Sequence, residues 1–253
     1  MNEYAIAAIP APILNTPHFS DVFRYPLPLD SQNLLRAVEA VALPGTKFRI
    51  AEDHGQICKV TTDEYLGTDL YVDRRFLEVS TAVPTERKRL LPSVEKILDS
   101  MRHSLGLPYI WGGNWSPGIE EMLAFYPPGK PLDPYSYSVW LLKGLDCSGL
   151  LFEATQGVTP RNTSQLVRYG EPLSICGLQP EEIIAKLRPL DLIVWSGHVI
   201  VVENQEHAIE SRHPIGVVRS SLLLRLREVL QERRAVDDWD STLGPRFVVR
   251  RFA

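Results

Sequence analysis

A change of hydrophobic pattern near Pro84 restricts the fold of this chain more than any other feature. Between residues 44 and 79, apolar side chains alternate with polar ones, and glycine-containing turns separate the short runs. Alternation with a period of two is typical of half-buried strands. Residues 1–84 are therefore predicted to form a small antiparallel β-barrel domain, to which the segment 31–43 could add a helix.

Past this point the spacing of the apolar residues becomes helical. From Val94 to Leu105 they recur three or four positions apart, with Ser93 able to cap the helix and Gly106 able to end it. A stretch rich in proline and aromatic residues, 114–143, follows. Its aromatic side chains could wall a cleft or belong to a packed surface excursion, and the sequence favours neither.

The remainder of the chain combines helices with sequential strands. A helix is predicted from Cys147, a second near 181–188, a strand and a β-hairpin across 189–213, and a last strand at 246–253. This succession is typical of an α+β domain and not of a doubly wound parallel sheet. We therefore predict an α+β fold in which the domain 85–253 packs the helix bearing the cysteine on an antiparallel sheet.

Composition places the chain among globular proteins. Of its 253 residues, 44% are hydrophobic and 23% are charged, which excludes the disordered and fibrous classes. The net charge of -4 gives no electrostatic reason to expect nucleic acid or an anionic membrane as a partner. No apolar run approaches the roughly 20 residues of a membrane span, and the first residues lack the basic start of a secretory signal. A monomeric cytoplasmic protein is expected.

Cys58, Cys147 and Cys176 are odd in number and far apart in the chain. A disulfide framework is therefore not expected, and free thiols suit a reducing compartment. No cysteine or histidine spacing matches a metal site, so the sequence predicts neither a metal nor another cofactor.

Cys147 differs from the other cysteines in its setting. It stands at the start of an apolar helix, between Asp146 and Ser148. The unpaired N–H groups and the helix dipole at this end stabilise a thiolate, which is the reactive form of cysteine. The alternative is a small buried core residue, but the two polar neighbours argue against it. Cys147 is therefore the candidate nucleophile.

A nucleophilic cysteine needs a base, and His198 is the best candidate because it opens an apolar strand directly after a glycine turn. If residues 198–212 form a hairpin centred on Asn204, Glu210 lies opposite His198 and can orient it. In the same hairpin, His207 points to the other face. The alternatives are that His198 has only a structural role and that Glu210 is an exposed residue of the strand.

Four stretches, in this order, resemble the successive motifs of NlpC-type peptidases. They are PYIWGGN (108–114), LDCSGLLFEA (145–154), TPRNTSQ (159–165) and PLDLIVWSGHVIVV (189–202). These enzymes are papain-like cysteine peptidases of bacterial cell-wall peptides, and the resemblance covers roughly residues 85–253. The N-terminal barrel resembles the bacterial SH3-like domain that precedes the catalytic domain in some members.

The resemblance implies cleavage of the bond between γ-D-glutamate and a diamino acid, commonly meso-diaminopimelate, in peptidoglycan stem peptides such as L-Ala-γ-D-Glu-diaminopimelate. Cys147 matches the nucleophile of the family and His198 matches its base. The third polar residue of the family, most often histidine, lies twelve positions after the base, where this chain has Glu210. A carboxylate can fix the imidazole tautomer in the same way as an aspartate does elsewhere.

In members with an SH3-like domain, an aspartate and a serine beside the cysteine and a tyrosine of the barrel help to bind a free N-terminal L-alanine. Asp146 and Ser148 match directly, and Tyr65 is the candidate for the tyrosine, with a plain core residue as its alternative. Tyr109 and Trp111 match the Tyr-x-Trp-Gly-Gly motif of the family, whose tyrosine lies near the cleft. The resemblance therefore implies these five residues as substrate-binding residues.

The expected function is an endopeptidase of free stem peptides, in murein recycling or wall remodelling. Two alternatives keep parts of this interpretation. The same three catalytic residues could serve an amidase or an acyl transfer to an amine. A catalytically inactive protein could use the barrel to bind the cell wall.

Overall fold

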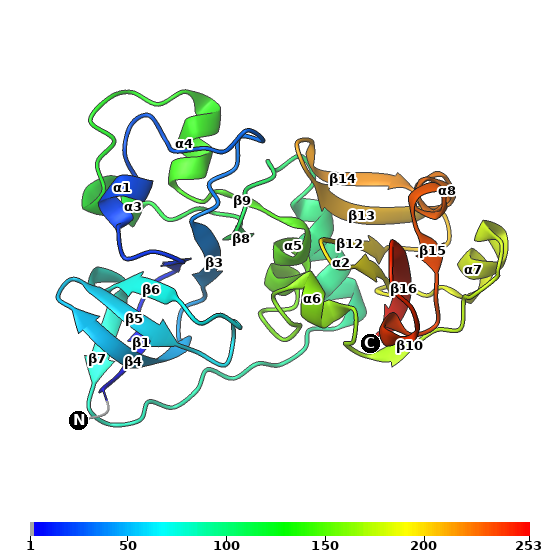
Figure 1. The fold of residues 1–253 in the computed structure, drawn as a ribbon, viewed down its shortest axis with the longest axis horizontal. Helices are drawn as coiled ribbons and strands as arrows, with labels where there is room; N and C mark the ends of the chain where they lie inside the picture. The colour runs from blue at the N-terminus through cyan, green and yellow to red at the C-terminus, as the bar shows by residue number, and fades with distance from the viewer. Residues whose placement is uncertain (1–2) are drawn as a thin grey trace. The chain divides into compact units, whose positions relative to one another are not determined.

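The computed structural model describes residues 3–253. It divides into two compact units that interleave in the sequence, and both contain helices and strands (Figure 1). Unit 1 comprises the chain up to Arg89 together with Pro108–Asp146, and unit 2 comprises Leu90–Leu107 together with Cys147–Ala253. The predicted domains, 1–84 and 85–253, stay a prediction.

Unit 1 is built on a seven-stranded antiparallel sheet with the strand order β3-β2-β6-β5-β4-β1-β7. Its strands are β1 (Glu3–Ala7), β2 (Ala11–Leu14), β3 (Val38–Ala42), β4 (Lys47–His54), β5 (Ile57–Thr61), β6 (Leu70–Asp73) and β7 (Leu77–Ser80). Phe48, Val60 and Val72 are fully buried, as the alternating pattern predicts. The antiparallel strands predicted for this region are confirmed, whereas its description as an SH3-like barrel stays a prediction.

The segment 31–43 contains strand β3 in place of the helix that the sequence could have added. β3 pairs with β2. Four of its five residues are buried, and only Glu39 is partly exposed. Pairing and burial in the sheet therefore outweigh the helix preference of alanine and glutamate.

The aromatic stretch 114–143 is packed into unit 1. It forms strand β8 (Asn114–Trp115), which pairs with β9 (Gly144–Leu145), and helices α3 (Glu121–Phe125) and α4 (Pro134–Trp140). Trp140 has no exposed surface, and its indole N–H donates to the carbonyl oxygen of Tyr126 at 2.9 Å. Both residues belong to the same hydrophobic core as helix α1 (Phe19–Val22) and the main sheet. For Trp140 and Tyr126, the interpretation as a packed segment therefore holds, and not the one as the wall of a cleft.

A buried carboxylate ties this stretch to the sheet. Asp73, at the end of β6, accepts hydrogen bonds from the guanidinium of Arg75, in the 3₁₀ turn η1 (Arg74–Phe76), and from the hydroxyl of Tyr126. Burial alone would raise the pKa of Asp73, but the hydrogen bonds from Arg75 and Tyr126 outweigh it and hold the pKa below its usual range. Asp73 is therefore an anion at neutral pH.

Unit 2 contains a second antiparallel sheet, with the strand order β10-β16-β11-β12-β13-β14, and β15 joins β16 in parallel. Its strands are β10 (Glu171–Pro172), β11 (Leu192–Trp195), β12 (His198–Val202), β13 (His207–Arg212), β14 (Gly216–Ser221), β15 (Arg234–Ala235) and β16 (Arg246–Arg251). Its helices are α2 (Val94–His103), α5 (Cys147–Ala154), α6 (Thr163–Leu166), α7 (Pro180–Lys186), α8 (Leu222–Glu232) and the 3₁₀ turn η2 (Trp239–Ser241).

Most elements predicted for this part of the chain are present, including the helix that begins at Cys147, the hairpin β12–β13 and the last strand, β16. Helix α5 packs against α2 and against strands β12 and β13. Helix α8 is absent from the sequence-based prediction, although Leu222, Leu226 and Val229 recur at helical spacing and are buried.

The β12–β13 hairpin is centred one residue later than predicted. Its paired residues place the centre at residue 205 and not at Asn204. Continued to the start of β12, this register puts His198 level with Arg212, with Glu210 two positions away. Because side chains alternate with a period of two, a displacement of two positions leaves Glu210 on the same face as His198.

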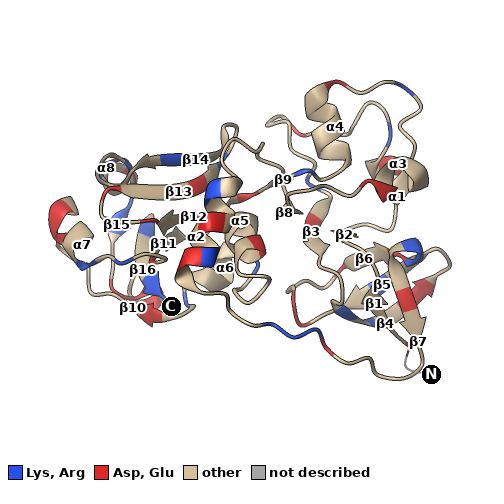
Figure 2. Cartoon of the chain, turned by 180° about the vertical axis from the view of Figure 1, so that it is seen from behind, with Lys and Arg blue, Asp and Glu red and all other residues tan. Residues whose placement is uncertain are grey.

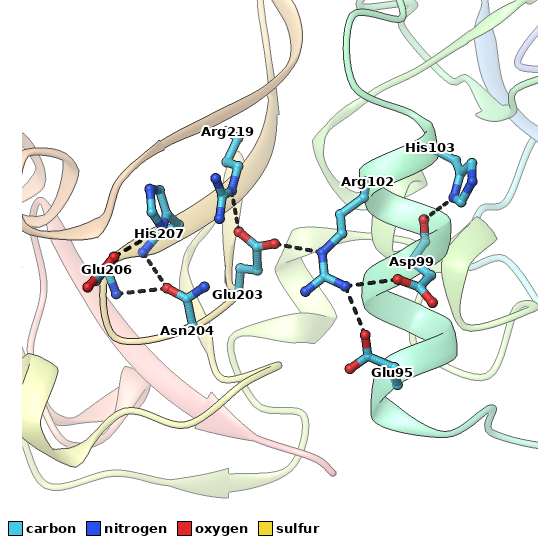
Figure 3. Close-up of polar contacts among 9 residues, drawn as sticks. All are labelled: Glu95, Asp99, Arg102, His103, Glu203, Asn204, Glu206, His207 and Arg219. Carbon is cyan, nitrogen blue, oxygen red and sulfur yellow. Dashed lines mark hydrogen bonds and ion pairs between the residues drawn. The ribbon is translucent and has the colours of Figure 1, made fainter.

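The loop end of this hairpin is fixed by a second buried carboxylate. Glu203 accepts hydrogen bonds from Nε of Arg102 on α2, at 2.7 Å, and from Nε of Arg219 on β14, at 2.5 Å (Figure 3). Arg102 also pairs with Glu95 and Asp99 on its own helix. The carboxylate of Glu203, which directly follows β12, therefore links α2 to β14.

Charged residues of both signs are spread along the elements of both units (Figure 2). Several of them form exposed pairs, such as Arg168 with Asp240 and Arg227 with Glu181. Within residues 3–253, no helix has both the length and the apolar character needed to cross a bilayer.

We expect Asp73→Ala to destabilise the protein by about 3 kcal/mol, because it leaves Arg75 and Tyr126 without their buried acceptor. Thermal unfolding followed by circular dichroism should show Tm lowered by several degrees. Since the pKa of Asp73 is depressed, its stabilisation is present at neutral pH and is lost as the pH falls below about 4. The difference in Tm between the variant and the wild type should therefore shrink in acid.

Asp69→Ala is the matched control, because Asp69 lies in the same unit and its side chain, which pairs with Lys59, is itself exposed. It should change Tm little. Equal losses of Tm in the two variants would contradict a special role of the buried carboxylate.

Candidate active site

Cys147 is the first residue of α5 and is buried. Its Sγ lies 3.9 Å from the carbonyl oxygen of Gly197, the residue that precedes His198. The predicted nucleophile thus lies beside the turn of unit 2 that precedes the predicted base. The N–H groups of the first helical turn have no partner within the helix, so this position favours a thiolate and could also stabilise a developing oxyanion.

The turn that carries His198 is fixed by its neighbours. Trp195 and His198 are cross-strand partners in β11 and β12, with Ser196 and Gly197 between them. Gly197 has a φ of +113°, which residues with a side chain rarely adopt. Its N–H donates to Oγ1 of Thr163, at the start of α6, over 2.9 Å. The loop that carries the third motif therefore holds this turn in place.

His198 and Glu210 form a close pair within the sheet. Nε2 of His198 lies 2.6 Å from Oε2 of Glu210, and the two side chains are 13% and 0% exposed. The contact predicted from the hairpin is present, although it is diagonal and not directly cross-strand. The alternative of an exposed strand glutamate is wrong. His207 lies at the loop, where its backbone N–H donates to Asn204 (Figure 3).

The charge of Glu210 sets the tautomer of His198. Burial alone would raise the pKa of Glu210, but hydrogen bonds from His198 and Arg225 outweigh it and hold the pKa below its usual range. An ionised carboxylate can only accept hydrogen bonds, so Nε2 of His198 carries the hydrogen between them. Nδ1 is then the ring nitrogen that can exchange a proton with a reacting group.

Arg225 is a site residue that could not be identified from the sequence. It lies on α8, and its Nε donates to Oε1 of Glu210 at 2.7 Å while Nη2 donates to Oε2 at 3.2 Å. Glu210 therefore has donors from two elements, β12 and α8. No motif links position 225 to position 210, because the contact arises only when α8 folds back on the sheet.

The ring of Trp195 packs against the imidazole of His198, with the ring centroids 5.1 Å apart. The guanidinium of Arg233 lies over the indole, 4.7 Å from its centroid. Trp195 is nearly buried, so it keeps water from one side of His198. Trp195 lies within the fourth motif, but the resemblance to the family implies no role for it.

Ser148 follows Cys147 on α5 and is buried. Its Oγ accepts a hydrogen bond from Nη1 of Arg161 at 2.9 Å, and Arg161 is itself buried. Arg161 is the arginine of the TPRNTSQ motif, so this contact explains physically why a charged residue stands in that loop. The hydroxyl beside the nucleophile is therefore held in one position.

Asp146 is the last residue of unit 1 and is buried. Its Oδ2 accepts the N–H of Gly112 at 3.1 Å, and its own N–H donates to the carbonyl oxygen of Gly113 at 2.9 Å. A Cβ at Gly113 would lie 2.4 Å from the carbonyl oxygen of Gly144, so this approach requires glycine. The two glycines of the first motif thus hold Asp146 in place.

The three aromatic residues predicted to bind substrate also belong to unit 1. The hydroxyl of Tyr65, which is buried, donates to a carboxylate oxygen of Glu39 on β3. Tyr109 is buried, and the guanidinium of Arg36 lies 4.0 Å from the ring centroid of Trp111. The roles of Tyr65, Tyr109 and Trp111 in binding stay predictions.

The other two cysteines have different settings. Cys58 is fully buried in the core of unit 1, and burial raises the pKa of its thiol. Cys176 is exposed in unit 2. Among residues 3–253, no three His, Cys, Asp or Glu side chains are grouped as metal ligands would be.

Comparison with protein-family models found no match, and comparison with curated proteins found none either. Comparison with solved structures gives remote matches. One is an NlpC/P60 family protein from Bacillus cereus, with 15% sequence identity and a TM-score of 0.39. The match covers 99% of this chain, which spans 63% of the length of the Bacillus cereus chain.

NlpC1 from Trichomonas vaginalis matches with 12% identity and a TM-score of 0.36, over 100% of this chain and 69% of its own. RipD from Mycobacterium tuberculosis, a non-catalytic NlpC/P60 domain protein adapted to peptidoglycan binding, matches with 16% identity and a TM-score of 0.37, over 62% of this chain and 95% of its own. Likeness at this level establishes neither the family nor the activity of this chain.

We expect iodoacetamide at about pH 6 to alkylate Cys147 at least tenfold faster than Cys176, because a thiolate at the start of α5 is favoured. Cys176 is the more exposed thiol, so accessibility alone predicts the opposite order. Mass spectrometry of the peptides that contain each cysteine measures both rates in one sample.

Cys58 is the internal control, since its burial in the core of unit 1 should keep it unreactive until the protein unfolds. Should Cys147 react no faster than Cys176, the activated thiolate would have to be abandoned.

Proposed function

We propose that this protein is a cysteine endopeptidase that hydrolyses the bond between γ-D-glutamate and a diamino acid in free peptidoglycan stem peptides. One observation carries the proposal: the thiol of Cys147 lies at the turn that presents His198, and His198 is hydrogen-bonded to the buried anion of Glu210. A thiol, an imidazole and an orienting carboxylate are the groups that acyl transfer through a thioester needs. The four motifs support the choice of cell-wall peptides.

In the first step, the thiolate of Cys147 attacks the γ-glutamyl carbonyl carbon and forms a C–S bond. The oxyanion of the tetrahedral intermediate is stabilised by N–H groups of the first turn of α5. When this intermediate collapses, the C–N bond breaks, and the imidazolium of His198 gives its Nδ1 proton to the leaving amine. Glu210 holds the Nε2–H throughout and stabilises the imidazolium.

In the second step, water releases the acyl group. Neutral His198 takes a proton from the water at Nδ1 while the oxygen attacks the thioester carbon. The C–S bond then breaks, Cys147 leaves as the thiolate, and the γ-carboxylic acid of glutamate is released and gives its proton to the solvent. The imidazolium and the thiolate are thereby restored for the next cycle.

The free amine of the substrate is proposed to be recognised by Asp146, Ser148 and Tyr65. Two contacts support this. Arg161 fixes the hydroxyl of Ser148, and Tyr65 donates its hydroxyl hydrogen to Glu39, so the phenolic oxygen can act only as an acceptor toward an ammonium group. Neither contact fixes the diamino acid, so meso-diaminopimelate rests on the resemblance.

We further propose that the enzyme acts as a cytoplasmic monomer in murein recycling or wall remodelling. A wall-binding protein without activity is the competing function, as is an amidase or an acyltransferase. The ionised Glu210 and its hydrogen bond to His198 favour catalysis over binding alone, because a binding protein has no need of an oriented base.

We expect the protein to convert L-Ala-γ-D-Glu-diaminopimelate into L-Ala-D-Glu and the free diamino acid, and Cys147→Ser to lower kcat/KM by about 10³-fold or more, since serine at this position lacks a thiolate. Liquid chromatography with mass spectrometry identifies the products. Cys176→Ser is the matched control and should retain full activity. An intact tripeptide after prolonged incubation with wild-type protein would refute the endopeptidase.

Blocking the N-terminus of the tripeptide tests recognition of the amine separately. We expect acetylation to lower kcat/KM by about 10²-fold, because the charge that faces Asp146 is removed. Asp146→Asn should reduce this preference toward unity. Equal cleavage of the free and the acetylated peptide would remove the binding roles of Asp146, Ser148 and Tyr65 and leave the nucleophile unaffected.

A further inference from the structure

Glu210, the partner of the imidazole of His198, is completely buried. Its side chain has no exposed surface, and it is held by His198 and Arg225. A buried carboxyl group without cations tends to take up a proton. The O–H of a protonated Glu210 would donate a hydrogen bond to Nε2 of His198. Nε2 would then be the acceptor and would not carry the hydrogen. A glutamate at this position therefore requires something that keeps it an acceptor.

Arg225 has the geometry for this task. Two of its N–H groups reach the two oxygens of Glu210, and Nη1 donates to Oε2 of Glu228 at 2.9 Å. Because the planar guanidinium binds both oxygens, it fixes the rotation of the carboxylate and also keeps it ionised. With that rotation fixed, Oε2 faces Nε2 of His198.

The sequence of α8 explains why an arginine lies on the buried side. Leu222, Leu226 and Val229 form the face that packs on the core, and position 225 falls within the same arc, three residues after the first and four before the last. Ser221 caps the helix through its Oγ, which accepts the N–H of Leu224. The side chain of Arg225 is consequently only 14% exposed.

We propose that Arg225 is a positioning residue that holds Glu210 as an oriented anion, so that a glutamate can act as the partner of the base. This inference rests on the proposed use of Cys147 and His198 as nucleophile and base, but not on the identity of the substrate. Arg225 acts through Glu210 and His198 and does not itself take part in the chemistry.

The elements packed on β13 are β12, β14, α5 and α8. Their charged or titratable residues are His198 on β12, Cys147 and Glu153 on α5, Arg219 on β14, and Arg225, Arg227, Glu228 and Glu232 on α8, with His207 and Arg212 on β13 itself. Arg219 pairs with Glu203, and Arg212 lies 3.8 Å from Glu228. Among these groups, His198 and Arg225 are the ones that donate hydrogen bonds to the carboxylate of Glu210.

The test measures alkylation of Cys147 by iodoacetamide between pH 4 and pH 9, with the modified peptide quantified by mass spectrometry. This readout needs no peptide substrate. The rate falls in acid as the thiolate–imidazolium pair takes up a proton. We define the acid limb by the pH at which the rate is half its value at pH 9. In Arg225→Met, Glu210 becomes neutral at a higher pH and supports the imidazolium less, so the neutral thiol–imidazole pair replaces part of the thiolate–imidazolium pair. More of the thiolate then forms only at higher pH, and we expect the acid limb to move up by about one pH unit.

Arg225→Lys keeps the charge and loses the fork. Its acid limb should stay close to that of the wild type, and kcat for any cleaved peptide should fall. Arg225→Gln keeps a donor without the charge and should shift the limb as Arg225→Met does, which preserves the test if the methionine variant does not fold. Arg227→Met is the matched control on the same helix, because the ion pair of Arg227 with Glu181 is exposed.

An acid limb that stays at its wild-type position in folded Arg225→Met or Arg225→Gln overturns the proposal. A limb that moves equally in Arg225→Lys overturns it too, because the charge would then not be the cause. If the limb moves as expected while no stem peptide is cleaved, the proposed substrate fails and the role of Arg225 stands. If stem peptide is cleaved while the limb stays in place, the role of Arg225 fails and the proposed substrate stands.

Discussion

The candidate site depends on an anion that is kept out of water. Glu210 lies inside unit 2, where the cost of burying a carboxylate is several kcal/mol unless cations and donors replace its hydration. His198 and Arg225 supply that replacement from two different elements. The orientation of the imidazole, the tautomer it adopts and the direction of its remaining nitrogen all follow from this one group.

Much of this arrangement could be predicted from the sequence, because it depends on local patterns. The helix from Cys147 follows from an apolar run with polar residues at its start. The contact of His198 with Glu210 follows from the alternation of side chains in a hairpin. The predicted centre of that hairpin is one residue early, which displaces each predicted partner by two positions. Because side chains alternate with a period of two, Glu210 still lies on the same face as His198.

The rest could not be predicted, because it depends on contacts between segments far apart in the chain. Arg225 reaches Glu210 only because α8 folds back on the sheet, and Tyr126 reaches Asp73 across more than fifty residues. The strand β3 lies in a segment whose alanines and glutamate favour a helix locally, and pairing with β2 decides its structure. Local propensity is overruled where a neighbouring strand offers hydrogen bonds and burial.

A buried carboxylate held by two hydrogen-bond donors lies at each end of strand β12. Glu210 and its partners lie beside its first residue, and Glu203 with Arg102 and Arg219 follows its last. Fraying from either end would leave a buried anion without its partners. The amide hydrogens of β12 should therefore exchange with solvent among the slowest in unit 2, through opening of the whole sheet and not through local motion.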